Sequence, residues 1–419
     1  LKAQDFTLGA MKSAHTSTLS AVHLDQIDPY YRSYQQTYAH TLLPGAEPWT
    51  IYNNVGAKVD TLPNHVRRFQ LDQRRTDDDA RFRDALLHHG SRGDCLNIDS
   101  HLLDRPSIVN MPIDFDQGAT LHIASMRGHS DLAQLLIQRR ANVNHTNHAQ
   151  QTPMHVASEA NHGMALMELL AAGGDADQRD QCKQTPLHRA AFAGAEDVVQ
   201  ALLDYGANAR LRDDGGLMPL HKAATMGREG AISMLLERDP ISVNMEAADG
   251  WTALHLAAHG GHAAACESLL AYGADANLCD SERMTPLHRA ATSGSHVACQ
   301  VLCRGGADIR AGDNLRNTPL HTACDEGHAM VVRALLLLGA PVDAIDRSRR
   351  TPLHIATESG HIAICELLLG YGADPTTMDA PKGVPSPLAV ARRNRNLELV
   401  ALLDAAAQRN QTPPLANPM

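Results

Sequence analysis

Short apolar stripes alternate with glycines along most of the chain, and residues 280–312 show the pattern clearly. Thr285 is a good N-cap and Pro286 suits the first helical position, so a helix is predicted to start there. Gly294 ends this helix, and Gly305-Gly306 ends a second one. The apolar faces consist of Leu287, Ala290 and Ala291 in the first helix and Val297, Val301 and Leu302 in the second. The unit therefore reads as helix, turn, helix, and an extended hairpin-like loop.

The same unit returns at a nearly constant spacing. A Thr-Pro-Leu-His tetrapeptide or a close variant recurs with steps of 33 residues, and one of 34, between its histidines, which are His122, His155, His188, His221, His255, His288, His321 and His354. A unit of this size cannot bury enough surface to fold alone, so its neighbours must cover both faces. The sequence thus predicts an all-α solenoid, a one-dimensional stack of helix pairs.

The fourth unit is one residue longer than the others. Asp239 and Pro240 replace the Gly-Ala that follows the second helix elsewhere. A one-residue insertion in a loop explains this difference. The alternative is a bend or a weaker interface between the fourth and fifth units.

These units resemble the ankyrin repeat family. The residues that carry the resemblance are Thr-Pro-Leu-His-x-Ala-Ala at 185–191 and 285–291, Gly-His pairs such as Gly327-His328, and Gly-Ala-Asp at 273–275. The match covers about residues 114–407. It implies that the tetrapeptide histidines bond to the Thr hydroxyl and to neighbouring loop backbone, tying units together.

The domain boundaries follow from the residues over which the repeat is recognisable. We expect a degenerate capping unit at 77–113, nine units at 114–410 with the last degenerate, and a Pro-rich tail at 411–419. Residues 1–76 form an aromatic-rich arm, in which Tyr30, Tyr34 and Tyr38 lie on one face of a predicted helix. That face covers either the flank of the solenoid or another protein, with disorder as the third alternative.

Charge and composition remove several classes of function. The net charge of −10, from 37 basic and 47 acidic residues, lacks the electrostatic footprint of a nucleic-acid binder. No apolar stretch approaches the length needed to span a bilayer. Cys266, Cys299 and Cys365 share one repeat position, which favours buried thiols and a reduced, intracellular protein, most simply cytoplasmic. Because the sequence starts at Leu1, a preceding targeting peptide stays open, as do nuclear, cytoskeletal and organellar locations.

The 24 histidines invite a metal hypothesis, but the repeat explains most of them. Eight belong to the tetrapeptide, and six more stand at the start of the second helix. No His-Glu-x-x-His or Cys-x-x-Cys spacing, phosphate loop or nucleophile elbow occurs. We therefore expect no metal, no cofactor and no catalytic residue.

The resemblance places the binding surface on the loop tips and on the exposed side of the first helix. Aromatic and Arg side chains dominate binding hot spots. The candidate partner-binding residues are Trp251, Met284, Arg289, Phe192, Arg189, Arg350 and Leu217. For Trp251 the alternative is packing on the next hairpin, and for Arg289 it is simple solvation.

Three functions fit these observations. The first is a non-catalytic scaffold or adaptor that binds a protein partner on the concave face. The second is an architectural subunit of a large assembly, anchored by the arm. The third is a recruitment module for a modifying enzyme carried on another chain.

Overall fold

The structure is a computed structural model that describes residues 81–113, 118–376 and 385–411 of the 419-residue chain. The chain divides into two compact units, Leu1–Ala80 and Arg81–Met419, and all described residues belong to the second. The expected arm, with Tyr30, Tyr34 and Tyr38, therefore lies outside the described residues. The same is true of residues 412–419 of the expected tail.

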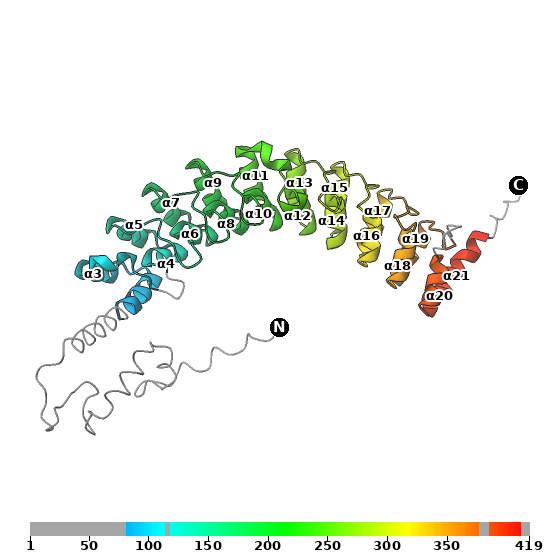
Figure 1. The fold of residues 1–419 in the computed structure, drawn as a ribbon, viewed down its shortest axis with the longest axis horizontal. Coiled ribbons are helices and arrows are strands. Elements are labelled where there is room, and N and C mark those ends of the chain that lie inside the picture. Colours follow the sequence, from blue (N-terminus) through cyan, green and yellow to red (C-terminus); the bar gives the residue numbers. More distant parts are fainter. Residues whose placement is uncertain (1–80, 114–117, 377–384, 412–419) are drawn as a thin grey trace, which may run out of the picture. The chain divides into compact units, whose positions relative to one another are not determined.

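The described part of the second unit is built from helices without a strand, so the expected all-α solenoid is confirmed. After a helical stretch at 81–92, two rows of helices run side by side (Figure 1). The inner row lies on the concave side and comprises α4 (Thr120–Arg127), α6 (Pro153–Glu159), α8 (Pro186–Ala193), α10 (Pro219–Thr225), α12 (Ala253–His259), α14 (Pro286–Ser293), α16 (Pro319–Asp325), α18 (Pro352–Glu358) and α20 (Pro387–Arg393).

The outer row pairs with the inner one, helix by helix. It comprises α3 (Cys95–Asp104), α5 (Ser130–Gln138), α7 (Gly163–Ala171), α9 (Glu196–Asp204), α11 (Glu229–Arg238), α13 (Ala263–Ala271), α15 (His296–Arg304), α17 (Ala329–Leu337), α19 (Ile362–Gly370) and α21 (Leu397–Gln411). Short 3-10 helices follow α3 and α11, namely η3 (Pro106–Asn110), η4 (Pro240–Asn244) and η5 (Ala248–Gly250). One continuous core of Leu, Ala, Val and Cys side chains lies between the rows.

The inner helix α12 starts with a reciprocal cap. The Thr252 hydroxyl accepts a hydrogen bond from the backbone N–H of His255, while His255 Nδ1 accepts one from the backbone N–H of Thr252 at 3.2 Å. Two of the four N–H groups that a helix start leaves unsatisfied are thereby paired. Leu254 and Ala257 then point into the core with no exposed surface.

The tetrapeptide histidines also join each unit to the next. Nε2 of His155, His188 and His288 lies 2.9–3.0 Å from a backbone carbonyl 29 residues further on. A carbonyl can only accept, so Nε2 carries a proton, and Nδ1 of the same rings accepts a backbone N–H, so the ring is neutral. Burial lowers the pKa of six such histidines, to about 4 for His188 and His221; the others are His155, His255, His288 and His321.

The histidines at the start of the second helix bond to the preceding unit, whereas the tetrapeptide histidines bond to the next one. His328 Nε2 donates to the carbonyl of Thr292 in the preceding unit at 3.0 Å. Its ring fills the space beside Gly294, where a Cβ would lie only 2.9 Å from it. Gly294 also has φ 78°, in the left-handed region that other residues rarely adopt. The Gly-His pattern of the sequence thus links neighbouring units as well as ending helices.

The extra residue of the fourth unit lies in a helix and not in a loop, so that part of the sequence interpretation is wrong. Helix α11 has 10 residues where α9 and α13 have 9. Asp239 and Pro240 then start the 3-10 helix η4. In this unit His221 bonds to the carbonyl of Met245, only 24 residues away. The expected bend or weak interface at this junction stays a prediction.

Candidate functional site

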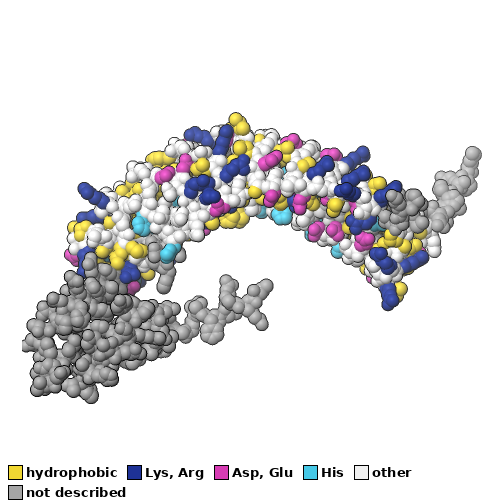
Figure 2. All heavy atoms as spheres, viewed as in Figure 1, with side chains coloured by type: hydrophobic (Ala, Val, Ile, Leu, Met, Phe, Trp, Pro, Cys, Tyr) yellow, Lys and Arg dark blue, Asp and Glu magenta, His cyan; other side chains and the backbone are white. Residues whose placement is uncertain are grey.

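The tips of the loops and the exposed positions of the inner helices form one row of side chains, which we call the inner face. Figure 2 shows acidic side chains along its lower edge in the half that holds α14 and α16. Seven sequence-predicted residues belong to the inner face by register. They are the tip residues Leu217, Trp251, Met284 and Arg350 and the helix residues Arg189, Phe192 and Arg289.

A buried aspartate shapes the tip in several units. In the sixth unit, Asp280 Oδ1 accepts the backbone N–H groups of Glu282 and Met284, both at 2.9 Å. The turn that makes this possible places Arg283 at φ 57°. Asp180, Asp213, Asp313 and Asp346 stand at the same position in other units and accept equivalent N–H groups. The aspartates thereby hold the tips in one conformation.

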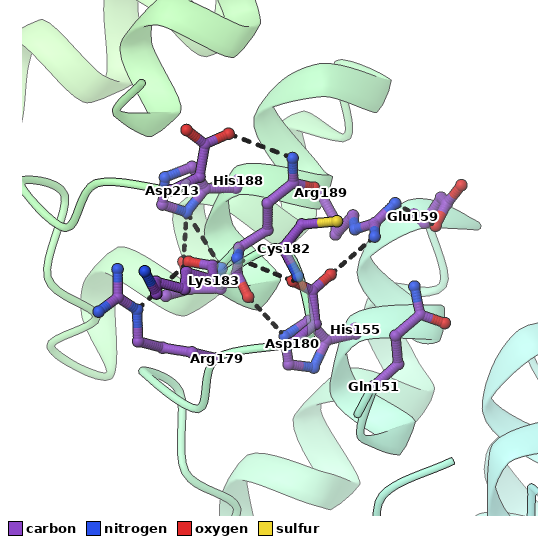
Figure 3. A network of polar contacts seen from close by, with 12 residues as sticks. Gln151, His155, Glu159, Arg179, Asp180, Cys182, Lys183, His188, Arg189 and Asp213 are labelled. Atoms are coloured by element: carbon purple, nitrogen blue, oxygen red, sulfur yellow. Dashed lines mark hydrogen bonds and ion pairs between the residues drawn. The ribbon is translucent and has the colours of Figure 1, made fainter. Parts of the chain in front are cut away.

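In Asp180, Asp213, Asp280 and Asp346 the second carboxylate oxygen binds a cation on the inner face. Arg189 Nη2 lies 2.7 Å from Asp180 Oδ2, and Lys222 Nζ lies 2.8 Å from Asp213 Oδ2. Figure 3 shows Arg189 between Asp180 and Glu159, the latter on the preceding inner helix. Burial by itself would raise the pKa of Asp213, but hydrogen bonds from Lys222, Leu217 and Gln184 lower it below its usual range.

The sixth and eighth units repeat this arrangement. Arg289 Nε donates to Asp280 Oδ2 at 2.9 Å, and Arg289 Nη2 lies 2.7 Å from Glu282. In the eighth unit the tip residue Arg350 itself pairs with Asp346 and with Glu358. The Arg289 side chain is only 13% exposed. The alternative that Arg289 is a simply solvated side chain is therefore wrong.

Trp251 and Arg289 come together from neighbouring units. The guanidinium carbon of Arg289 lies 4.3 Å from the centre of the Trp251 ring, which is a cation–π geometry. His259 meets the same ring edge-on, with the ring centres 5.5 Å apart. Trp251 is half-buried. These three residues and Asp280 form a preorganised aromatic and ionic cluster, which we call the Trp251 cluster.

The other predicted residues are separate from this cluster. Phe192 is 43% exposed on α8, and Arg228 donates a hydrogen bond to its backbone carbonyl. Leu217 and Met284 are half-buried and accept, through their carbonyls, the histidine bonds of the preceding unit. Their backbone role is therefore structural, and only their side chains are available to a partner.

Sequence reasoning missed the buried aspartates. The signal was present, because Asp180, Asp213 and Asp280 each stand five residues before the first residue of the tetrapeptide and nine before the cation they bind. Recognising the pair requires knowing that the tip folds back over the helix. The spacing alone does not indicate this.

Among the described residues, no group of three or more His, Cys, Asp or Glu side chains could hold a metal ion, and no helix is long and apolar enough to cross a membrane. Burial raises the pKa of the Cys266 and Cys299 thiols to about 12, so these thiols stay protonated at neutral pH. A thiol in that state is a poor nucleophile and a poor metal ligand. Cys266 and Cys299 therefore serve as small core side chains.

Family comparisons agree with the geometry of the stack. A model described as ankyrin repeats in three copies matches residues 160–247, 240–313 and 298–379, and one for ankyrin repeats in many copies matches residues 121–170. The chain belongs to the ankyrin repeat family. A comparison with curated proteins found no match. Ankyrin repeats are generally protein–protein interaction modules, and ankyrin repeat proteins are typically non-catalytic.

Proposed function

We propose that this ankyrin repeat protein is a non-catalytic scaffold or adaptor that binds a protein partner on its inner face. The observation that carries the proposal is the Trp251 cluster. An aromatic ring and an arginine, the side chains enriched in binding hot spots, are held together by a buried aspartate before any partner arrives.

Preorganisation matters because binding otherwise costs about 0.5–1.5 kcal/mol for each long side chain that a partner immobilises. On the inner face, Arg189, Arg289 and Arg350 are already held by ion pairs within the chain. The exposed ring of Phe192 adds an apolar contact two inner helices away from Trp251. A rigid surface with these features suits a folded partner or an extended segment laid along the stack.

The experiment that tests the proposal is affinity capture from native lysate, with the retained proteins identified by mass spectrometry. The full chain is compared with a chain that starts at Thr76, and circular dichroism checks that the shorter chain is folded. Retention of one partner set by both chains supports the inner face as the binding surface. Loss of all partners from a folded short chain contradicts it and favours an architectural subunit anchored by residues 1–76.

A further inference from the structure

A second candidate surface lies on the loops of the sixth and seventh units, next to the inner-face tip residue Met284. A groove of about 610 Å³ is lined by three arginines, Arg283, Arg310 and Arg316, and by an apolar wall of Pro341, Ala344 and Ile345. Within the described part of the chain, none of the three guanidinium groups has a hydrogen bond or an ion pair.

Arg310 is unpaired because a series of hydrogen bonds that joins successive loops, which we call the loop ladder, is interrupted at this position. In several other units, an Asn or Asp side chain at this position accepts the backbone N–H of the residue 31 further on, as Asn244 does from Asp275 and Asn277 does from Asp308. In the third unit Arg210 stands there and pairs with Asp239. The residue 31 beyond Arg310 is Pro341, which has no N–H to donate. An Asn or Asp side chain at position 310 would therefore have no backbone N–H to accept, and the chain has an arginine there instead.

The free state of Arg283 and Arg316 has a similar origin. Lys183 stands at the same turn position in the third unit and pairs with Asp214, 31 residues on, at 2.7 Å. The equivalent residues for Arg283 and Arg316 are Asn314 and Arg347, neither of which can neutralise a cation. Both arginines have thus lost the acidic neighbour that Lys183 keeps.

The backbone at this turn makes an arginine costly. Arg283 and Arg316 have φ 57° and 62°, in the left-handed region. Gln150, Lys183 and Arg349 share this conformation at the same position of other units, and two units place Gly216 and Gly250 there. A residue other than glycine costs roughly 1 kcal/mol there. Arg283 and Arg316 are therefore two long, unneutralised cations that line one groove.

The groove has a net positive charge although one acid lines it. The Asp313 carboxylate is occupied by the backbone N–H groups of Leu315 and Asn317 and by the Asn317 side chain. Three arginines against one aspartate leave two uncompensated positive charges in a chain whose net charge is −10. Arg is the side chain best suited to binding carboxylates in pairs of hydrogen bonds.

We propose that this groove binds an acidic peptide segment of a partner protein, with carboxylates on the three arginines and an apolar side chain against Pro341, Ala344 and Ile345. Packed helices lie about 8–10 Å apart, so equivalent tips of adjacent units present their cations at about that spacing. A peptide in the extended polyproline II conformation advances roughly 3.1 Å per residue with about three residues per turn, so side chains three residues apart lie on one face at about this distance. A single phosphate does not span it and leaves the apolar wall uncovered.

The test is fluorescence anisotropy of a fluorescein-labelled peptide that repeats Glu-Glu-Leu, titrated with the full chain. We expect binding that weakens in about 0.5 M NaCl, and no binding of a peptide that repeats Gln-Gln-Leu. The triple variant Arg283→Gln, Arg310→Gln, Arg316→Gln should bind at least about tenfold more weakly. The matched control carries Arg127→Gln, Arg304→Gln and Arg333→Gln, which removes the same charge from exposed sites elsewhere, and it should bind as the unaltered chain does.

Three results would overturn the proposal. Equal losses in the two triple variants would mean unspecific attraction, and unchanged binding in the groove variant would place the peptide elsewhere. Binding of pyrophosphate or of phosphatidylserine vesicles through the three arginines, without binding of the peptide, would assign the groove to a different ligand. The inner-face variant Phe192→Asp should keep peptide binding, so failure of this proposal and failure of the proposed function are distinguishable.

Discussion

Arg289 stacks on Trp251 with its guanidinium carbon 4.3 Å from the ring centre, although the two residues belong to different units of the stack. The contact joins the inner face of the fifth unit to that of the sixth. The fully buried carboxylate of Asp280 holds this arginine in place through an ion pair. The contact that Trp251 makes therefore depends on the ion pair of Arg289 with Asp280.

The stacking contact should be measurable as a coupling energy. In a double-mutant cycle with Trp251→Ala and Arg289→Ala, we expect the two losses of unfolding free energy to be non-additive by about 1 kcal/mol. Urea unfolding followed by circular dichroism provides the measurement. Additive losses would mean that the ring and the guanidinium are neighbours without a net attraction.

Asp280 and Asp313 provide a matched pair for testing the buried ion pairs. Asp280→Asn keeps an oxygen for the N–H groups of the tip but leaves Arg289 without its buried partner, which should cost about 2–3 kcal/mol of unfolding free energy. Asp313 holds the same kind of tip, but Thr322 replaces the cation. Asp313→Asn should therefore cost less than about 1 kcal/mol. Equal losses would show that the tip hydrogen bonds, and not the cations, make these aspartates important.

The buried histidines make stability depend on pH. Their pKa is lowered in the folded chain, to about 4 for His188 and His221, and returns to its ordinary value of about 6.5 on unfolding. The unfolded chain therefore binds more protons between these two values, and stability is lost as the pH falls through that window. At pH 5, His188 and His221 should each remove about 2 kcal/mol relative to pH 8.

Two measurements check this pH dependence. Urea unfolding at pH 8, 7, 6 and 5 should show a midpoint that falls steadily below pH 7. Nuclear magnetic resonance of the imidazole groups should find the His188 ring still neutral at pH 5. An unfolding midpoint that is constant or rises over this range would contradict the account.

The break in the loop ladder predicts a rescue. Arg310→Asn alone adds an acceptor, but Pro341 has no N–H to donate to it. Pro341→Ala alone adds an N–H, but Arg310 has no oxygen to accept it. Together they should restore the hydrogen bond that Asn277 makes with Asp308, so the double variant should exceed the sum of the single effects by about 1 kcal/mol of unfolding free energy. If the two changes are additive, Pro341 is not the reason for Arg310.

Much of the fold could be predicted from the sequence because the signals are local and repeated. The period, the caps at Thr252 and its equivalents, and the left-handed glycine at Gly294 each depend on residues a few positions apart. The pairing of Arg289 with Asp280 could not be predicted in this way, because it depends on how the tip folds back. The extra residue of the fourth unit was assigned to a loop because a helix can lengthen by one residue without changing its apolar pattern.

The candidate site was predicted only as a set of separate positions. Trp251 and Arg289 were both selected, yet their contact crosses a unit boundary and depends on the stacking distance. The groove at Arg310 becomes visible only when equivalent residues of successive units are compared, together with the turn geometry at Arg283 and Arg316. Such sites depend on departures from the repeat, whereas the fold depends on what the units share.

The central claim is that the inner face binds a protein partner, and one comparison tests it most directly. Phe192→Asp places a charge on the inner face, and Met330→Asp does the same on the outer helix α17, where Met330 is 57% exposed against 43% for Phe192. Each variant is immobilised, and the proteins that it retains from native lysate are compared with those retained by the unaltered chain. We predict that Met330→Asp keeps the partner set and that Phe192→Asp loses it. Retention by Phe192→Asp together with loss by Met330→Asp would contradict the claim and move the binding surface to the outer helices.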